Sequence, residues 1–275
     1  MSEPRARRAR RPGRARSQHF LRTQALAAEL VRDAGVLPTD LVLDLGAGSG
    51  RLTAELAQVA ERVIAVELDR HWAGRLRGRW DNVLVVNDDA AIVELPREPF
   101  RVVANLPFDR TTAILRHLLD DPFVALQRAD VIVDWYVAVK RALPWPSTLN
   151  GVLWGARFSA AVTRRLPRSS FAPPPSVDAG MLVLERRSRP LVSAERHESY
   201  RRFASAGFRH GLRAVAPARV LRALGLARAQ PRDLDAHAWA ELFAQAGFGD
   251  AAVRWGARGR RARRAGRRPA PRGGS

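Results

Sequence analysis

Three successive predicted strands end in residue types that suit a nucleotide-like cofactor. The first runs into Asp44-Leu45-Gly46-Ala47-Gly48-Ser49-Gly50, where alternate glycines let the backbone pass close to a ligand that any Cβ would meet. Glu67 ends the second strand, 21 residues after Gly46, where a carboxylate can accept both hydroxyls of a ribose. Asp89 follows the third strand and is placed to bond an adenine edge. This layout is typical of an S-adenosylmethionine (SAM) pocket and predicts Gly46, Gly48, Gly50, Glu67 and Asp89 as cofactor-binding residues.

Alternatives to this interpretation exist for each part. A glycine turn alone equally suits a structural tight turn, and its G-x-G-x-G spacing differs from the G-x-G-x-x-G that presents a helix N-terminus to a pyrophosphate. Asp88 neighbours Asp89, and either could be the adenine partner. Spacing favours Asp89, while the other aspartate would cap a turn.

Asn105-Leu106-Pro107-Phe108 follows the fourth predicted strand and suits methylation of an exocyclic amine on a base. Such an amine is a poor nucleophile because its lone pair is delocalised into the ring. The Asn105 side-chain oxygen and the Leu106 carbonyl can accept both amine hydrogens, which frees the lone pair for in-line attack on a sulfonium methyl. Pro107 fixes the turn, and Phe108 can stack on a flipped base. Positioning and electrostatics carry this chemistry, so these four residues are the predicted catalytic group.

Several other chemistries are excluded or lack their residues. The chain has no cysteine, which removes disulfides, cysteine-zinc sites and thiol nucleophiles. The six histidines show no metal-ligand spacing, so no metal is predicted. Ser49 and Thr53 have no base partner and are not nucleophiles. No apolar run approaches the ~18 residues that span a bilayer, and we expect a cytoplasmic, monomeric protein.

Alternating strand and helix signals must position these residues, and they predict an α/β fold with a parallel sheet. The expected strands are Leu41–Leu45, Val63–Val66, Val83–Val86, Val102–Ala104 and Asp130–Val133. The expected helices are Thr23–Ala34, Leu52–Ala60, His71–Arg79 and Thr111–Leu119. Arg157–Leu166 and Gly180–Glu185 can pair as an antiparallel edge.

A second domain begins where apolar residues change to helical spacing. From Tyr200 through Leu221 to Phe243 the pattern predicts a small all-helical domain. The resulting division is a disordered Arg-rich tail at 1–16, a SAM-dependent methyltransferase domain at 17–187, a helical RNA-binding domain at 188–255 and a second Arg-rich tail at 256–275.

The net charge of +20 predicts a polyanionic partner. The two tails alone carry +6 and +8 of it, and they are either phosphate-neutralising arms or the drift of a GC-rich genome. Lys140 is the one lysine among 47 basic residues. A possible phosphate track includes the predicted substrate-binding residues Arg110, Arg141, Arg164 and Arg165, with Arg116, Lys140 and Arg168 beside them; any single one of these also suits a solvated charge. Trp135 and Tyr136 are expected to pack under the substrate loops rather than to stack on RNA.

With these residues assembled, the chain resembles the rRNA adenine N6-methyltransferases. This superfamily comprises the erythromycin-resistance (Erm) enzymes, which act on 23S rRNA, and housekeeping dimethyltransferases of small-subunit rRNA. The resemblance runs from about Ser17 to Trp255. Its further motifs are Ser17-Gln18-His19-Phe20-Leu21 and Phe171-Ala172-Pro173-Pro174-Pro175-Ser176-Val177-Asp178.

The resemblance implies a Rossmann-like methyltransferase fold and roles for further residues. It implies that His19 and Leu21 contact SAM together with Asn105, and that Phe171 holds the target adenine opposite Phe108. His19 departs from the family, which usually has Asn there, and Asp44 stands where many relatives have Glu.

Within the superfamily the resemblance favours the Erm branch, on the Arg-rich tails, Asn-Leu-Pro-Phe and Val177–Gly180. The expected function is therefore N6-methylation of a 23S rRNA adenine at the macrolide site, with one or two methyls, giving macrolide–lincosamide–streptogramin B resistance. The alternatives are a housekeeping small-subunit (16S) dimethyltransferase and a non-catalytic RNA-binding assembly factor on the same fold.

Overall fold

The computed structural model describes residues 19–142 and 148–247. Both predicted tails lie outside the described residues, as do Ser17, Gln18 and the last part of the predicted 188–255 domain. The described residues form two compact units, 19–142 with 159–186 (the sheet unit) and 148–158 with 187–247 (the helical unit).

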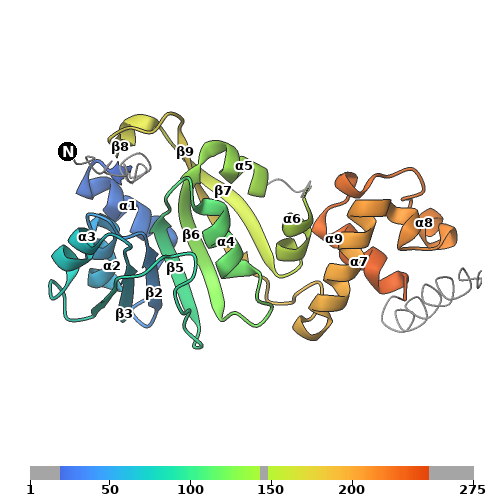
Figure 1. The fold of residues 1–275 in the computed structure, drawn as a ribbon, viewed down its shortest axis with the longest axis horizontal. Helices are drawn as coiled ribbons and strands as arrows, with labels where there is room; N and C mark the ends of the chain where they lie inside the picture. Colours follow the sequence, from blue (N-terminus) through green and yellow to red (C-terminus); the bar gives the residue numbers. More distant parts are fainter. Residues whose placement is uncertain (1–18, 143–147, 248–275) are drawn as a thin grey trace, which may run out of the picture. The chain divides into compact units, whose positions relative to one another are not determined.

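The sheet unit is built on a seven-stranded sheet in the order β4-β3-β2-β5-β6-β9-β7 (Figure 1). Its strands are β2 (Leu41–Leu45), β3 (Arg62–Val66), β4 (Val83–Val86), β5 (Phe100–Asn105), β6 (Leu126–Asp134), β7 (Phe158–Leu166) and β9 (Ala179–Arg186). The strands β4, β3, β2, β5 and β6 are parallel, and β9 pairs antiparallel with β6. The expected pairing at the β9–β7 edge is present. The predicted α/β architecture is confirmed.

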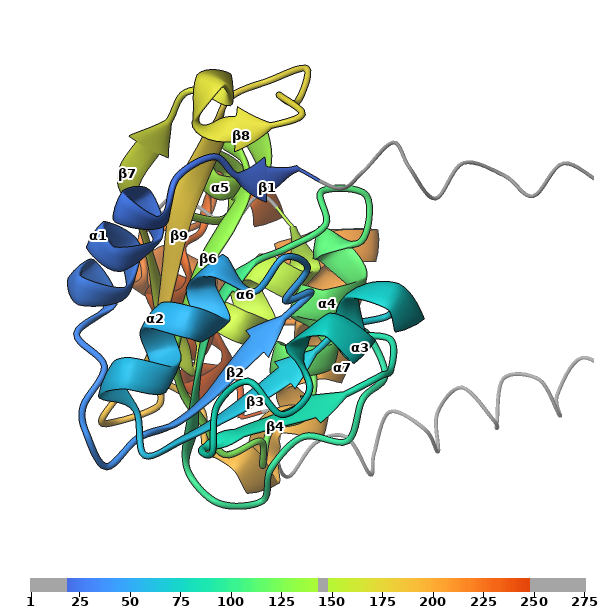
Figure 2. The same ribbon diagram turned by 90° about the vertical axis from the view of Figure 1, so that its left-hand side faces the viewer.

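The helices of this unit are α1 (Gln24–Ala34), α2 (Arg51–Val59), α3 (Arg70–Leu76), α4 (Thr111–Leu119) and α5 (Trp135–Ala142), with the short 3-10 helix η1 (Arg168–Ser170). Helices α1 and α2 cover one face of the sheet and α4 lies on the other (Figure 2). The start and end of α1 follow the sequence signals: the Thr23 side chain accepts from the Leu26 backbone N–H, and Gly35 ends the helix in the left-handed region.

A second, two-stranded sheet joins the N-terminal segment to the proline-rich loop. The strands β1 (Phe20–Leu21) and β8 (Phe171–Ala172) pair antiparallel, with Leu21 opposite Phe171. Two motifs some 150 residues apart therefore lie side by side. This pairing fixes the backbone that follows His19 and the backbone at Phe171.

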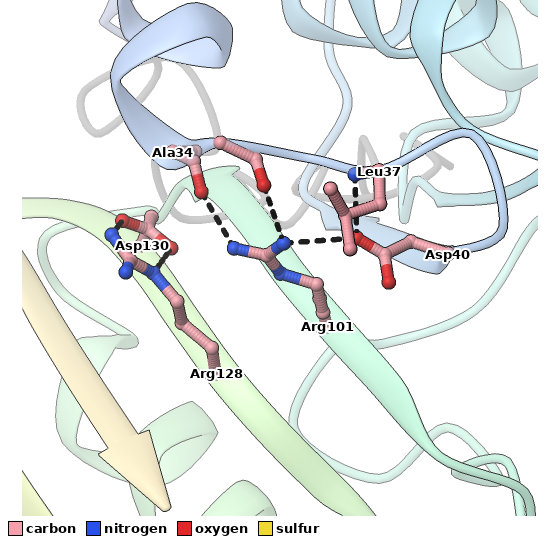
Figure 3. A network of polar contacts seen from close by, with 7 residues as sticks. Ala34, Leu37, Asp40, Arg101, Arg128 and Asp130 are labelled. Carbon is pink, nitrogen blue, oxygen red and sulfur yellow. Dashed lines mark hydrogen bonds and ion pairs between the residues drawn. The ribbon is translucent and has the colours of Figure 1, made fainter.

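Arginine side chains hold α1 to the sheet (Figure 3). Arg101 on β5 donates to the carbonyls of Gly35 at 2.7 Å and Ala34 at 2.5 Å, and to Asp40 at 2.9 Å. Because the end of a helix leaves carbonyls without intrahelical partners, these bonds satisfy the C-terminus of α1. On the neighbouring strand, Arg128 makes two 2.7 Å bonds to Asp130.

The helical unit consists of α6 (Leu149–Gly155), α7 (His197–His210), α8 (Ala218–Ala223) and α9 (Ala236–Gln245), with 3-10 helices η2 (Ala194–Arg196), η3 (Leu212–Ala214) and η4 (Pro231–Asp233). Its core is aromatic: Tyr200, Phe203 and Phe243 meet edge to face at 5.2–5.3 Å. The sequence boundary at 187 placed α6 in the first domain. In the structure α6 groups with the helical unit, because Val152 and Leu153 pack into this same core.

Candidate active site

A cavity of about 480 Å³ opens at the carboxyl ends of β2, β3 and β5. Parallel α/β sheets bind ligands at this edge, because the loops that follow adjacent strands converge there. The cavity is lined by predicted residues from five segments of the chain: His19, Gly46, Gly48, Glu67, Asp89, Asn105, Leu106, Pro107, Phe108 and Arg110.

The glycine turn brings its backbone against the cavity at Gly48. Gly48 has φ +53°, and a Cβ there would lie 2.6 Å from Cε1 of Phe20. Both the backbone conformation and the space therefore require glycine. Gly50 does not line the cavity; a Cβ at this position would meet the Leu76 side chain instead. The cofactor contact of Gly50 stays a prediction, and the absence of a side chain there leaves room for Leu76 of α3.

Two carboxylates of the cavity are fixed by backbone donors. Glu67 is 5% exposed; its Oε2 accepts from the Gly48 N–H at 2.8 Å and its Oε1 from the Asp69 N–H at 2.8 Å. Asp89 accepts from the Ala91 N–H at 2.9 Å and from Arg110 at 2.6 Å. Asp88 also lines the cavity, so the structure brings both candidates for the adenine partner to it.

The carboxyl of Asp44 lies behind the glycine turn and is completely buried. The Thr53 hydroxyl donates to it at 2.6 Å. Burial raises the pKa of Asp44 to about 7, with the Thr53 hydrogen bond opposing the rise and the nearby charge of Glu67 adding to it. The carboxyl behind the glycine turn therefore changes its charge near neutral pH.

Asn105 holds the centre of the predicted catalytic group. Its Nδ2 donates to the His19 carbonyl at 2.7 Å, while its Oδ1 is buried and has no hydrogen-bond partner among the described residues. An unsatisfied buried acceptor costs about 1–3 kcal/mol, and this one belongs to a residue that lines the cavity. The Leu106 N–H donates to the Ile132 carbonyl at 3.1 Å, which ties the tetrapeptide to β6.

Aromatic rings surround the tetrapeptide. Phe108 lies 5.6 Å from the His19 ring and 6.3 Å from Phe171, which it meets edge to face. Phe171 is fully buried, so in this structure it supports Phe108 rather than lining the cavity. Leu21 is also buried in the core and does not line the cavity, although the resemblance implied a cofactor contact. Its backbone pairing with Phe171 positions the neighbouring His19.

Phe20 is a cavity residue that the sequence analysis did not assign. It packs against the glycine turn at Gly48 and against Trp72 at 5.1 Å. The signal was its place beside His19 in an unusual motif. Leu68, Asp69 and Ile114 also line the cavity, and nothing in their spacing marked them.

The predicted phosphate-binding arginines do not lie together at one site. Arg110 lines the cavity, and Arg165 lies over the Trp135 ring at 4.8 Å while pairing with Asp178 at 2.8 Å. Arg141 is half-buried, and desolvation followed by the charge of Arg116 lowers its pKa. Arg164 is held by Glu29 at 2.7 Å and Asp33 on α1 and lines a different cavity. The structure therefore does not bring Arg164 to the site.

The residues present fit SAM. A glycine cradle that a Cβ would fill, a backbone-fixed carboxylate and an orphaned acceptor converge on one cavity. Glu67 and Asp88 have no ion-pair partner among residues 19–142 and 148–247. Such a cavity favours a cationic ligand such as a sulfonium. In the same described ranges, no group of three His, Asp or Glu residues is arranged to hold a metal, and no helix is long and apolar enough to cross a membrane.

Comparison with known proteins decides the family. The profile of the family described as "Ribosomal RNA adenine dimethylase" matches residues 13–216. The chain belongs to this family of SAM-dependent methyltransferases. SAM is accordingly its cofactor.

Three relatives show the range of similarity. The chain is 34% identical over 239 residues to "Mycinamicin-resistance protein MyrB" of Micromonospora griseorubida, covering 82% of this chain and 76% of the relative. It is 38% identical over 194 residues to "Ribosomal RNA small subunit methyltransferase A" of Streptomyces avermitilis, covering 66% and 65%. The crystal structure of 23S rRNA methyltransferase ErmE superimposes with a TM-score of 0.73 at 28% identity, covering 82% of this chain and 99% of that one.

Other curated relatives are matched over a smaller part of their length. The chain spans 63–66% of the length of three proteins named rRNA adenine N-6-methyltransferase.

Proposed function

We propose that this protein transfers a methyl group from SAM to N6 of an adenine in rRNA. The observation that carries the proposal is the buried Oδ1 of Asn105, which has no partner among the described residues and belongs to a residue that lines the cavity together with Phe108. SAM supplies an electrophilic methyl on a sulfonium. The amine hydrogens of the target adenine give the Asn105 oxygen the bond that it lacks.

The residues of the tetrapeptide divide the work. Asn105 Oδ1 and the Leu106 carbonyl accept the two amine hydrogens, which localises the nitrogen lone pair. Phe108 stacks on the flipped base, supported from behind by Phe171 at 6.3 Å. Glu67, Asp89 and the turn at Gly48 hold the cofactor, and the His19 carbonyl fixes the orientation of Asn105 at 2.7 Å. No strong general base is required, because the proton leaves from an activated cationic product.

The proposed target is the macrolide-site adenine of 23S rRNA, with one or two methyls added and macrolide–lincosamide–streptogramin B resistance as the result. The likeness to MyrB over 82% of the chain and to the ErmE structure supports this branch. Arg110, Arg165 and the basic tails, together with the helical domain, would bind the RNA backbone of naked or precursor rRNA. We place the enzyme in the cytoplasm as a monomer.

A second candidate is methylation of 16S rRNA. It is favoured by the 38% identity to a small-subunit methyltransferase over 194 residues. The two branches use the same chemistry at the same site, so they differ only in the RNA presented to Phe108.

Purified full-length protein, tritiated SAM and defined RNAs separate these functions. The 23S proposal expects methyl incorporation into a naked 23S transcript and none into 16S rRNA or assembling small subunits. The reverse pattern would establish the small-subunit function. Incorporation into neither RNA, with no SAM binding by calorimetry, would contradict both and leave a non-catalytic RNA-binding protein.

A further inference from the structure

The sheet unit presents an exposed aromatic side chain beside the active site. Tyr136 is 72% exposed at the first turn of α5. The sequence analysis expected Trp135 and Tyr136 to pack together under the substrate loops, and for Tyr136 that expectation is wrong. Trp135 is partly covered by Arg165 and β9, whereas the next side chain points to solvent. A single exposed aromatic is common on protein surfaces, so the position of Tyr136 and its charged neighbour must carry the argument.

The N-terminus of α5 is fixed from two sides, which holds Tyr136 in place. The Asp134 carboxylate accepts from the Tyr136 backbone N–H at 2.8 Å and so caps the helix. On the other side, α5 packs closely on β9: a Cβ at Gly180 would lie 2.8 Å from the Ala138 Cβ. Tyr136 is therefore displayed on a rigid element, and ordering it on binding costs little entropy.

The start of α5 is linked through the backbone to the segments on the target-base side of the active site. The Trp135 backbone N–H donates to the Asp178 carbonyl at 3.0 Å. Asp178 ends the same short loop that begins with Phe171, the residue behind Phe108. In addition, β6 leads into α5 and lies next to β5, which ends in Asn105. Helix α5 thus begins at the carboxyl end of β6. The tetrapeptide begins at the carboxyl end of the neighbouring strand β5.

The charge around Tyr136 suits a polyanion. Lys140 is exposed and lies four residues further along α5, on the same face of the helix. Arg165 lies over the neighbouring Trp135 at 4.8 Å. Because Arg165 is paired with Asp178 at 2.8 Å, the cation available beside Tyr136 is Lys140. An exposed aromatic ring beside a cation suits stacking on a base with a contact to its phosphate.

We propose that Tyr136 and Lys140 form a binding platform for single-stranded RNA next to the target adenine, with Tyr136 stacking on a flanking base and Lys140 contacting its phosphate. The inference rests on the RNA substrate of the proposed function, but not on whether that RNA is 23S or 16S. Stacking on a base is sequence-tolerant, so the platform adds affinity and fixes where the target nucleotide enters, without reading a sequence.

Steady-state methylation of the rRNA transcript that the wild-type protein modifies tests the platform. Tyr136→Ala is expected to raise KM for RNA about tenfold, with kcat and SAM affinity unchanged, because Tyr136 does not line the cofactor cavity. Tyr136→Trp keeps a stacking face and is expected to stay within about twofold of the wild type. Phe123→Ala is the matched control, since Phe123 is 70% exposed just before β6, at the opposite end of that strand.

Transcripts with an abasic nucleotide on either side of the target adenine sharpen the assay. On one of the two, the wild-type protein is expected to lose the same tenfold while Tyr136→Ala loses nothing further. Lys140→Gln is expected to reduce the salt dependence of binding relative to the control Arg97→Gln, which is exposed before β5.

Two outcomes separate this inference from the proposed function. An active wild type with equal KM for Tyr136→Ala and Phe123→Ala would overturn the platform alone. A wild type that methylates neither rRNA would overturn the proposed function. In that event, a ten-nucleotide oligoadenylate with a central 2-aminopurine still tests stacking: wild type and Tyr136→Trp are expected to quench its fluorescence and Tyr136→Ala to fail. Equal quenching by all three would overturn the inference.

Discussion

The cavity at the carboxyl ends of β2, β3 and β5 and a second cavity of about 320 Å³ beside α1 are both lined by charged side chains. In the second cavity these charges neutralise one another: Arg128 binds Asp130, and Arg164 binds Asp33. In the first, Arg110 also pairs with Asp89 at 2.6 Å, but Glu67 has no ion-pair partner within the described ranges and Asn105 Oδ1 has no hydrogen bond.

The difference shows that charged residues lining a cavity do not by themselves indicate function. Paired groups have already recovered their desolvation energy within the protein, whereas unpaired buried groups hold free energy that a ligand can release. This contrast makes the first cavity a site of chemistry and the second a part of the framework. Each of the following predictions tests one side of that contrast.

Removing the orphaned acceptor should have the largest effect. Asn105→Ala is expected to lower kcat for RNA methylation at least 100-fold, because the amine hydrogens lose their acceptor in the transition state. The melting temperature should fall only modestly, because the variant loses one hydrogen bond, from Nδ2 to the His19 carbonyl, while the Oδ1 makes none in the free protein.

The matched control is Asn82→Ala, whose amide donates to the Ala57 and Ala60 carbonyls at 3.0 and 3.1 Å. It should reduce stability and leave kcat intact. Retained turnover in Asn105→Ala would show that another group accepts the amine hydrogens. The unpaired Oδ1 would then not distinguish the first cavity from the second.

Breaking a pair in the second cavity should affect stability instead of turnover. Arg128→Met leaves Asp130, which is 2% exposed, as an uncompensated buried charge, and we expect a loss of about 3 kcal/mol in the free energy of unfolding. Urea denaturation measures this loss. The double variant Arg128→Met with Asp130→Asn should recover most of it, and a single variant as stable as the wild type would refute the framework role.

The buried Asp44 makes stability depend on pH. Its folded pKa of about 7 lies above the unfolded value of 3.8, so the folded state binds an extra proton between these two pH values. Stability from this group is therefore present at low pH and lost as pH rises to about 7, by an amount on the order of 4 kcal/mol, because one pKa unit corresponds to about 1.4 kcal/mol. Denaturation of the wild type and Asp44→Asn at pH 5, 6, 7 and 8 should show a smaller decline in the variant; parallel curves would contradict this assignment.

Two glycines with positive φ provide the comparison with the smallest expected effect, and it separates cofactor affinity from stability. Gly48→Ala meets Phe20 in the site cavity, whereas Gly35→Ala at the end of α1 meets nothing within 4 Å. Each should cost about 1 kcal/mol of stability from left-handed strain, and Gly48→Ala should cost more because its Cβ would lie 2.6 Å from Phe20. Calorimetry should show SAM binding weakened about tenfold or more in Gly48→Ala and unchanged in Gly35→Ala. Equal SAM affinities in the two variants would show that the turn does not approach the cofactor.

The sequence predicted the strands and helices of the sheet unit well, because apolar runs, helical periodicity and caps are local signals. Val83–Val86 and Thr111–Leu119 appear with the expected bounds, and Gly35 ends α1 as expected. Contacts between segments that are far apart in the sequence leave no such local signal. The burial of Leu21 and Phe171 follows from the β1–β8 pairing, and the placement of Arg164 follows from two acids on α1.

Exposure was equally hidden from the sequence. Trp135 and Tyr136 are adjacent aromatics of similar size, and only the packing of α5 on β9 through Gly180 decides which one is covered. The lack of a partner for Asn105 Oδ1 likewise depends on the position of the His19 carbonyl, which accepts from the other atom of the same amide. The types and spacing of the site residues were therefore predictable, while their pairing was not.

Mass spectrometry of rRNA from a macrolide-susceptible host tests the central claim most directly. The host expresses either the wild-type protein or Asn105→Ala, and the fragment that contains the macrolide-site adenine of 23S rRNA is mapped. The account predicts a mass gain of one or two methyls there for the wild type and none for the variant. An unmodified 23S fragment in the wild-type strain, with new methylation on 16S rRNA or on neither RNA, would contradict it.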